Sequence, residues 1–276
     1  MKAYKIINLI PIFAFYACSE ISMPETAQYV SFNTCVSESR ATDTSFDKND
    51  KISVFAMIDN GYNTPGNVDD YAYAQNVPYY YNGSNFSAMS EGIELKDKND
   101  KLFYYALYPY DSNIEGQYTF ECRKDQSDYS DYTLSDLMIA FTNESSNSQL
   151  VDLNFHHLLS KTVVNLEYSD IEVYSVTLTD IKYSVKFDME NNVITTLSNR
   201  DDVTMCTNGN KSYKAILPYQ IIKKDTKFAM IETNIGTYSV TASNDIKLNL
   251  GMIKNIYVNI DSSRGANSVV CTAYTK

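Results

Sequence analysis

The chain has 276 residues, of which 44% are hydrophobic, enough to bury a core and to exclude wholesale disorder. Its formal net charge is -11, and its lysine and arginine residues are scattered. A nucleic-acid-binding protein needs a basic face to neutralise phosphates, so nucleic acid is not an expected partner. The aromatic residues are 24 tyrosines and 12 phenylalanines without tryptophan. Such rings fit the half-buried surface of a β-sheet, so the composition favours a β-rich fold.

The first 17 residues have the features of an export signal. Lys2 and Lys5 supply a positive start, and the apolar run that follows is too short to span a bilayer. The run ends at Ala17 and Cys18, where a small residue precedes cysteine as at a lipoprotein cleavage site. We therefore predict a signal peptide over 1–17 and a lipid on Cys18. An ordinary signal cleaved near Ala17, with Cys18 unmodified, is the alternative.

The rest of the chain is a series of short apolar or alternating segments separated by Asn, Asp and Ser turns. In 29–36, Val30, Phe32 and Val36 fall on one face of a period-two pattern, which predicts a strand. Further strands are expected at 102–108, 118–122, 137–141, 150–155, 162–168, 173–179, 183–187, 193–197, 213–217, 228–231, 237–240, 246–250 and 256–260.

About fourteen short strands without convincing helical periodicity predict an all-β protein. This number is too large for one small sandwich, so two β-sandwich domains in tandem are expected. We place the boundary near residue 168, which gives domains over 41–168 and 169–276.

A short sequence, Asp-Lys-Asn-Asp-Lys, occurs twice, at 47–51 and 97–101, each time directly before a segment predicted to be an apolar strand. Its alternating Asp and Asn residues suggest a calcium loop at first sight. A calcium loop of the EF-hand type needs glycine at its sixth position and glutamate at its twelfth, and neither copy has them. Both copies are therefore predicted to be turns in which Asp and Asn side chains bond the backbone.

The sequence offers no catalytic, cofactor-binding or metal-binding residues. His156 and His157 are adjacent, and on a strand they would point to opposite faces, so they could not bind one metal ion together. Motifs for a serine nucleophile, a zinc protease, a phosphate loop or a dinucleotide are missing. Carboxylate pairs such as Asp201 and Asp202 are expected in polar turns. A non-enzymatic protein is therefore predicted.

The sequence allows two interpretations for the cysteines beyond Cys18 and two for a run of three tyrosines. Four cysteines beyond Cys18 form no CxxC pair, so they are either in a disulfide or free thiols; these are Cys35, Cys122, Cys206 and Cys271. Tyr79, Tyr80 and Tyr81 are consecutive and could stack on a sugar. An aromatic strand packed on the core is the favoured interpretation of these tyrosines.

Several segments in order resemble the fimbrillin family, the Mfa-like pilins of type V fimbriae in Bacteroidales. The segment pair 136–140 (DLMIA) and 151–161 (VDLNFHHLLSK) is the most specific part of the resemblance. The other similar segments are 39–41 (SRA) with 45–55 (SFDKNDKISVF), 104–110 (YYALYPY) and 215–220 (AILPYQ).

The resemblance implies two transthyretin-like β-sandwich domains and export as a lipoprotein to the cell outer membrane. Carried onto this sequence, Cys18 would carry the lipid, a palmitate-type anchor, and an Arg-specific protease would cut between Arg40 and Ala41. The leader 18–40 would then leave with its strand. A strand from a neighbouring fimbrial subunit would replace it, and 269–274 is the candidate donor.

The resemblance thus implies a structural subunit of a surface fimbria, as shaft, anchor or tip, assembled by donor-strand exchange. A surface lipoprotein adhesin that binds glycan or host protein through Tyr79, Tyr80 and Tyr81 is the alternative. An enzyme such as a glycosidase is disfavoured, since carboxylates are abundant here and a pair of them carries little weight.

Overall fold

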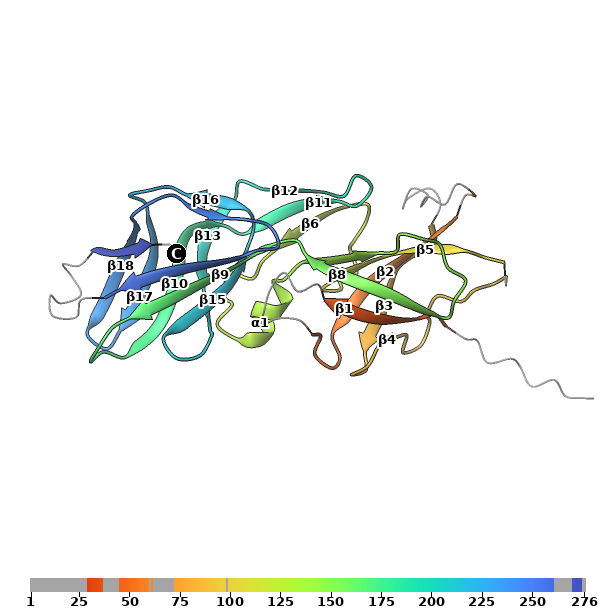
Figure 1. Cartoon of the computed structure of the whole chain (residues 1–276), viewed down its shortest axis with the longest axis horizontal. Helices are drawn as coiled ribbons and strands as arrows, with labels where there is room; N and C mark the ends of the chain where they lie inside the picture. Colours follow the sequence, from red (N-terminus) through yellow and green to blue (C-terminus); the bar gives the residue numbers. More distant parts are fainter. Residues whose placement is uncertain are drawn as a thin grey trace, which may run out of the picture.

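The computed structural model describes residues 29–36, 45–59, 61, 72–97, 99–260 and, for the backbone only, 270–274. Within these residues it has twenty-one strands and a single short helix, so the chain is all-β, as predicted (Figure 1). Cys18, Arg40, Ala41 and Val269 lie outside the described residues. No helix in the described part of the chain is long and apolar enough to cross a membrane.

Seven strands close into a barrel in the order β1-β4-β3-β2-β5-β7-β8. The closing strand is β1, which pairs with β8 in parallel and with β4 in antiparallel orientation. The barrel strands are β1 (Ser31–Val36), β2 (Lys51–Ile58), β3 (Ala72–Tyr81), β4 (Phe86–Ser87), β5 (Leu102–Tyr108), β7 (Met138–Phe141) and β8 (Leu150–His157).

The remaining strands form a nine-stranded sheet in the order β13-β10-β17-β18-β21-β20-β9-β15-β14, a three-stranded sheet β12-β11-β6 and a pair β16-β19. Figure 1 shows an elongated molecule with β1 to β5 at one end and β10, β17 and β18 at the other. These strands are β6 (Gln117–Glu121), β9 (Ser160–Glu167), β10 (Val173–Lys182), β11 (Ser184–Asp188), β12 (Val193–Thr196), β13 (Arg200–Thr204), β14 (Cys206–Thr207), β15 (Ser212–Leu217), β16 (Gln220–Ile222), β17 (Lys227–Thr233), β18 (Gly236–Ala242), β19 (Ile246–Leu248), β20 (Ile253–Asn259) and β21 (Val270–Tyr274).

Strand β2 is buried on both faces, which explains its nearly continuous apolar sequence. Ile52 and Val54 point into the barrel and join its core. Phe55 and Met57, at the alternate positions, belong instead to a second core that extends through β6 to the sheets of the C-terminal part. The outer wall of the barrel is thus packed against the rest of the molecule, and the two cores share this wall.

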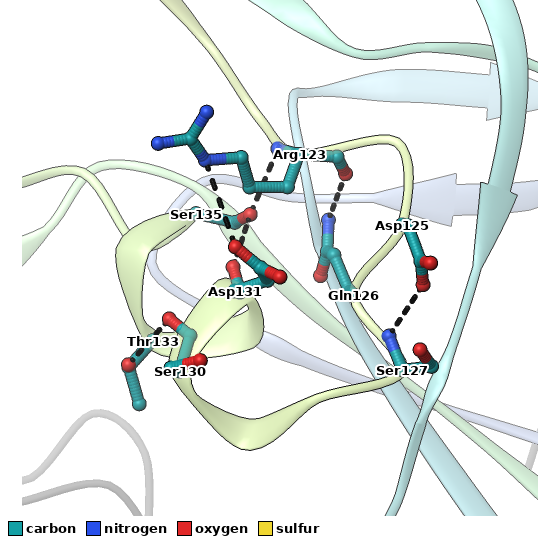
Figure 2. Close-up of polar contacts among 8 residues, drawn as sticks. All are labelled: Arg123, Asp125, Gln126, Ser127, Ser130, Asp131, Thr133 and Ser135. Atoms are coloured by element: carbon teal, nitrogen blue, oxygen red, sulfur yellow. Dashed lines mark hydrogen bonds and ion pairs between the residues drawn. The ribbon is translucent and has the colours of Figure 1, made fainter.

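The helix α1 (Tyr129–Leu134) was not expected, because its sequence shows no apolar 3.6-residue period. Hydrogen bonds with distant residues hold the segment around it. Gln126 is fully buried; its Nε2 donates to the Ile216 carbonyl at 3.0 Å, and its Oε1 accepts from the Ile216 amide at 2.8 Å. Ser135 Oγ accepts from the Arg123 amide at 2.9 Å and donates to the Asp131 carbonyl at 2.8 Å (Figure 2).

Several short strands were also not predicted, so the expected number of strands, about fourteen, is lower than the twenty-one that the described residues form. Asp201 and Asp202, expected in a turn, lie in β13 at the edge of the nine-stranded sheet. Most side chains of β13 are exposed, so the sequence shows no apolar alternation. β4, β14 and β16 have two or three residues each, too few for a pattern to be visible.

Replacing Phe32 by alanine is expected to lower the free energy of unfolding by about 3–5 kcal/mol, because a fully buried ring would leave a cavity in the barrel. Urea titration followed by circular dichroism measures the change. Asn33→Ala, on the exposed face of the same strand, is the control and should change stability by about 0.5 kcal/mol at most. Equal effects of the two changes would contradict the placement of β1.

Candidate site of strand exchange

Strand β1 pairs along its whole length with one neighbouring strand and at a single position with the other. Its six residues pair in parallel with Leu150–Phe155 of β8, whereas its pairing with β4 consists of Phe32 opposite Phe86. The ladder begins with the Ser31 amide, which donates to the Gln149 carbonyl at 2.8 Å. β1 therefore closes the barrel, and its loss would leave the edge of β8 without a partner.

The inner face of β1 is apolar, as the alternation predicted. Val30, Phe32 and Val36 are buried in the barrel core. The Phe32 ring makes edge contacts with Tyr79 at 4.9 Å and Tyr104 at 5.2 Å between centroids. Contacts of this kind add to the free energy of apolar burial.

The outer face of β1 is polar and matches β8 residue by residue. Asn33 Nδ2 donates to Asp152 Oδ1 at 3.0 Å, and the Cys35 thiol donates to Asn154 Oδ1. These exposed pairs join residues that are partners in the parallel ladder, so they favour one register of β1 on β8. Among the described residues, Cys35, Cys122 and Cys206 form no disulfide; for Cys271 the structure describes the backbone alone.

A small cavity of about 60 Å³ lies at the end of β1, lined by Val36, Phe46 and Asp50 among others. The Phe46 ring packs edge-on against Phe86 at 4.9 Å and Phe155 at 5.1 Å, so it plugs this end of the barrel. From the sequence, Asp50 was predicted only as a turn residue, and Phe46 was given no structural role. A lone aromatic residue in a polar stretch gives no periodic signal, and only the folded barrel reveals its role.

The Asp50 carboxylate is half-buried beside this cavity. Burial raises its pKa above the ordinary value of 3.8, and backbone hydrogen bonding from Asp47 opposes that rise. The Tyr108 hydroxyl donates to Asp50 Oδ1 at 3.4 Å. Burial, with the nearby Asp50 charge, raises the pKa of Tyr108, so this phenol stays protonated as a donor.

The turn prediction for the repeated Asp-Lys-Asn-Asp-Lys sequence is confirmed. The Asp47 amide donates to Asp50 Oδ2 at 2.8 Å, and the Asp97 amide donates to Asp100 Oδ2 at 3.1 Å. Asn49 has a positive φ of 76°, which asparagine tolerates better than most residues. Each turn thus uses its own carboxylates to direct the chain into a barrel strand.

The histidines point to opposite faces of β8, as predicted. His156 is exposed, whereas His157 is buried, with its Nδ1 at 2.8 Å from Asp136 Oδ2. This contact joins the end of β8 to the segment after α1. In the part of the chain that the structure describes, no three His, Cys, Asp or Glu residues come together in a way that could hold a metal ion.

The three consecutive tyrosines differ in their surroundings. Tyr79 is fully buried, its hydroxyl accepts a hydrogen bond from the Ile93 amide at 2.8 Å, and burial raises its pKa to about 12. Tyr81 packs against the barrel core. Tyr80 is half-buried, with Lys51 Nζ 4.9 Å from its ring centroid. Tyr79 therefore has no surface for a sugar in this fold.

The candidate donor segment lies within the sheet of its own chain. Strand β21 runs between β18, to which it is parallel, and β20, to which it is antiparallel. Its pairing with β18 covers four residue pairs from Ser239↔Val270 to Ala242↔Ala273. In Figure 1, β21 is the blue strand near the C-terminus, beside β18. It fills the space between two strands that would otherwise have open edges.

This geometry defines an all-β protein in which the first strand of the described residues closes a barrel. The model of the fimbrillin-like family matches residues 39–273, so the chain belongs to the fimbrillin-like family. Fimbrillins are structural proteins of fimbriae, which agrees with the expectation of a non-enzymatic role. No curated protein matches this chain.

Solved structures share the fold at low sequence identity. A candidate cell adhesion protein from Bacteroides ovatus is 16% identical with a TM-score of 0.66, and the match covers 91% of this chain and 97% of that one. One from Bacteroides uniformis is 14% identical with a TM-score of 0.64, covering 90% and 96%. One from Bacteroides thetaiotaomicron is 14% identical with a TM-score of 0.52, covering 87% and 94%. At these identities the matches show the fold alone.

Replacing Asp50 by asparagine is expected to raise the melting temperature at pH 7. A carboxyl whose pKa is raised in the folded state binds its proton more tightly there, so its ionisation at neutral pH destabilises the fold. Asparagine keeps a side-chain oxygen that can accept the hydrogen bond from the Asp47 amide. The stabilisation by asparagine should decrease as the pH falls. It should disappear below the ordinary pKa of 3.8, where the Asp50 carboxyl of the wild type is protonated in both the folded and the unfolded state. Thermal unfolding across this range measures it, and a lower melting temperature at pH 7 would contradict the burial of Asp50.

Proposed function

We propose that this chain is a structural subunit of a surface fimbria, exported as a lipoprotein and assembled by donor-strand exchange. The observation that carries the proposal is the position of β1, which lies at the start of the described chain and completes a barrel whose other strands all come later. Because β1 has a full ladder with only β8, its removal breaks few other backbone pairings. The vacated position would offer an apolar interior and an open strand edge to another strand.

Processing between Arg40 and Ala41 would separate β1 from the remainder of the barrel. The proposed cut follows Val36, the last residue of β1, and precedes Phe46, which plugs the end of the barrel. An Arg-specific protease acting there would release the leader strand and keep the plug. This position fits a cut that opens the barrel without removing residues needed to hold the rest of it.

We further propose β21 as the donor strand. A strand that pairs at both edges within its own sheet has the backbone groups needed to pair equally within a neighbouring subunit. Its release would require the loss of its ladders with β18 and β20. Lipid on Cys18 would hold the unprocessed chain at the outer membrane until the leader is cut.

The change of sheet along the chain supports two tandem domains. β8 belongs to the barrel, and β9 belongs to the nine-stranded sheet. We proposed domains over 41–168 and 169–276; the pairing of β9 with β15 and β20 supports a division at 158–159, about ten residues earlier. The first and last long strands of each part, β1 with β8 and β9 with β20, are parallel neighbours. This shared arrangement is further support for a repeated fold.

Arg40→Lys is expected to prevent cleavage by an Arg-specific protease, because the positive charge remains while the preferred side chain is lost. Mass spectrometry of surface protein should then find lipidated Cys18 in the variant and free Ala41 in the wild type. The SDS-resistant ladder of the wild type should be missing in the variant. Arg123→Lys, at an exposed arginine, is the matched control and should leave both results unchanged. Ladders formed by uncleaved Arg40→Lys protein would contradict a role for processing.

Ending the chain after Ile260, which removes β21, is expected to abolish ladder formation by processed protein. The shortened chain should still bind to full-length subunits through its vacated β1 position, because β21 is not part of the barrel that would receive the donor strand. Mixing labelled shortened protein with processed full-length protein, followed by SDS electrophoresis without heating, measures both effects. A ladder formed by the shortened chain alone would exclude β21 as the donor strand.

A further inference from the structure

A groove of about 610 Å³ runs beside β3, away from the strand-exchange site. Its walls come from β2, from the middle of β3 and from the segment 112–117 that leads into β6. The tyrosines Tyr79, Tyr80 and Tyr81 do not line it. Its volume is in the range of about 300–1,000 Å³ that is typical of sites for small ligands.

A β-bulge builds this groove. The register between β2 and β3 shifts so that two residues of β3, Gln75 and Asn76, lie opposite the single residue Phe55 of β2. A bulge redirects side chains, and bulges are frequent next to binding sites. Asn76 has a positive φ of 49°, a conformation that is strained for most residues and that gathers at functional sites. The bulge therefore interrupts the ladder between β2 and β3 and shapes the wall of the groove.

The Asn76 side chain ties the two walls together. Its Nδ2 donates to the Asp111 carbonyl at 2.9 Å, which holds the segment 112–117 against β3. Its Oδ1 is buried, and none of the described residues gives it a hydrogen bond. A buried acceptor without a donor is unfavourable, and a ligand hydroxyl or water at the groove could offset that.

The chemistry of the lining residues is neutral and rich in amides. Gln75, Ser112 and Gln117 are exposed, and Glu115 is the single charged group among the lining residues described. Primary amides present a donor and an acceptor side by side, which suits neighbouring hydroxyl groups. Phe55 also lines the groove but is almost fully buried, so it offers little surface to a ligand. No basic residue is among the described residues that line the groove, so phosphate and sulfate groups find no counter-charge from them.

We propose that this groove binds a neutral carbohydrate of one or two pyranose rings. The amides and the serine hydroxyl would pair with sugar hydroxyls. A strand from another subunit fits less well, because β3 is already paired with β2 on one side and β4 on the other. Sugar binding is independent of the proposed polymerisation, and either property can fail without the other.

Saturation-transfer difference NMR with the purified full chain tests the proposal, using maltose, lactose and chitobiose at millimolar concentration as probes. At least one of these disaccharides should give a signal. Its affinity should fall by about tenfold or more in a Gln75→Ala, Gln117→Ala double variant, because two hydrogen-bonding side chains are lost. Sialyllactose should bind more weakly than lactose, since Glu115 at the groove would repel its carboxylate.

The matched control is an Asn244→Ala, Asn249→Ala double variant, which removes two exposed amides far from the groove in sequence and should bind as the wild type does. Thermal unfolding of both variants checks that the fold is kept. Three results would each overturn the proposal. They are no signal from any neutral disaccharide, a disaccharide affinity of the Gln75→Ala, Gln117→Ala variant equal to that of the wild type, and stronger binding of sialyllactose than of lactose. Loss of subunit association without loss of sugar binding in the groove variant would assign the groove to a protein contact instead.

Discussion

The parallel ladder between β1 and β8 closes the barrel, and much of the N-terminal part of the molecule depends on it. Six residue pairs join the two strands, and exposed side-chain pairs at Asn33 and Cys35 favour their register. Closure lets Phe32 lie in the interior against Tyr79 and Tyr104. A closed barrel has no open edge, so the same ladder also protects the chain from pairing with a wrong partner.

The position of β1 in the barrel also limits what its removal would disturb. In the order of the strands, β2 and β5 lie on the side opposite to β1. These two strands carry Phe55 and Phe103 into the second core. The wall that joins the barrel to the C-terminal sheets is therefore distant from the strand proposed to leave. A barrel of this design could open on one side and remain attached on the other.

The joint between the two parts depends on a few buried polar contacts as well as on apolar packing. Gln126 bonds both backbone groups of Ile216, and β6 pairs with β11 although the two strands are about sixty residues apart in sequence. A buried amide with satisfied bonds fixes one geometry, because any other arrangement would leave its polar atoms without partners. The joint is thus held in a single geometry.

The sequence by itself determined most of the longer strands, the two repeated turns and the family resemblance. Alternation marked the inward residues Phe32 and Val36, adjacency put His156 and His157 on opposite faces, and β5 begins and ends where it was predicted. These signals are local, since a side chain's direction follows from its neighbours along the strand. Only the tertiary structure decided which strands pair, where Phe46 lies, why α1 forms and how the bulge at Asn76 opens a groove. Those features depend on contacts between residues far apart in the chain, and such contacts leave no periodic pattern in a single sequence.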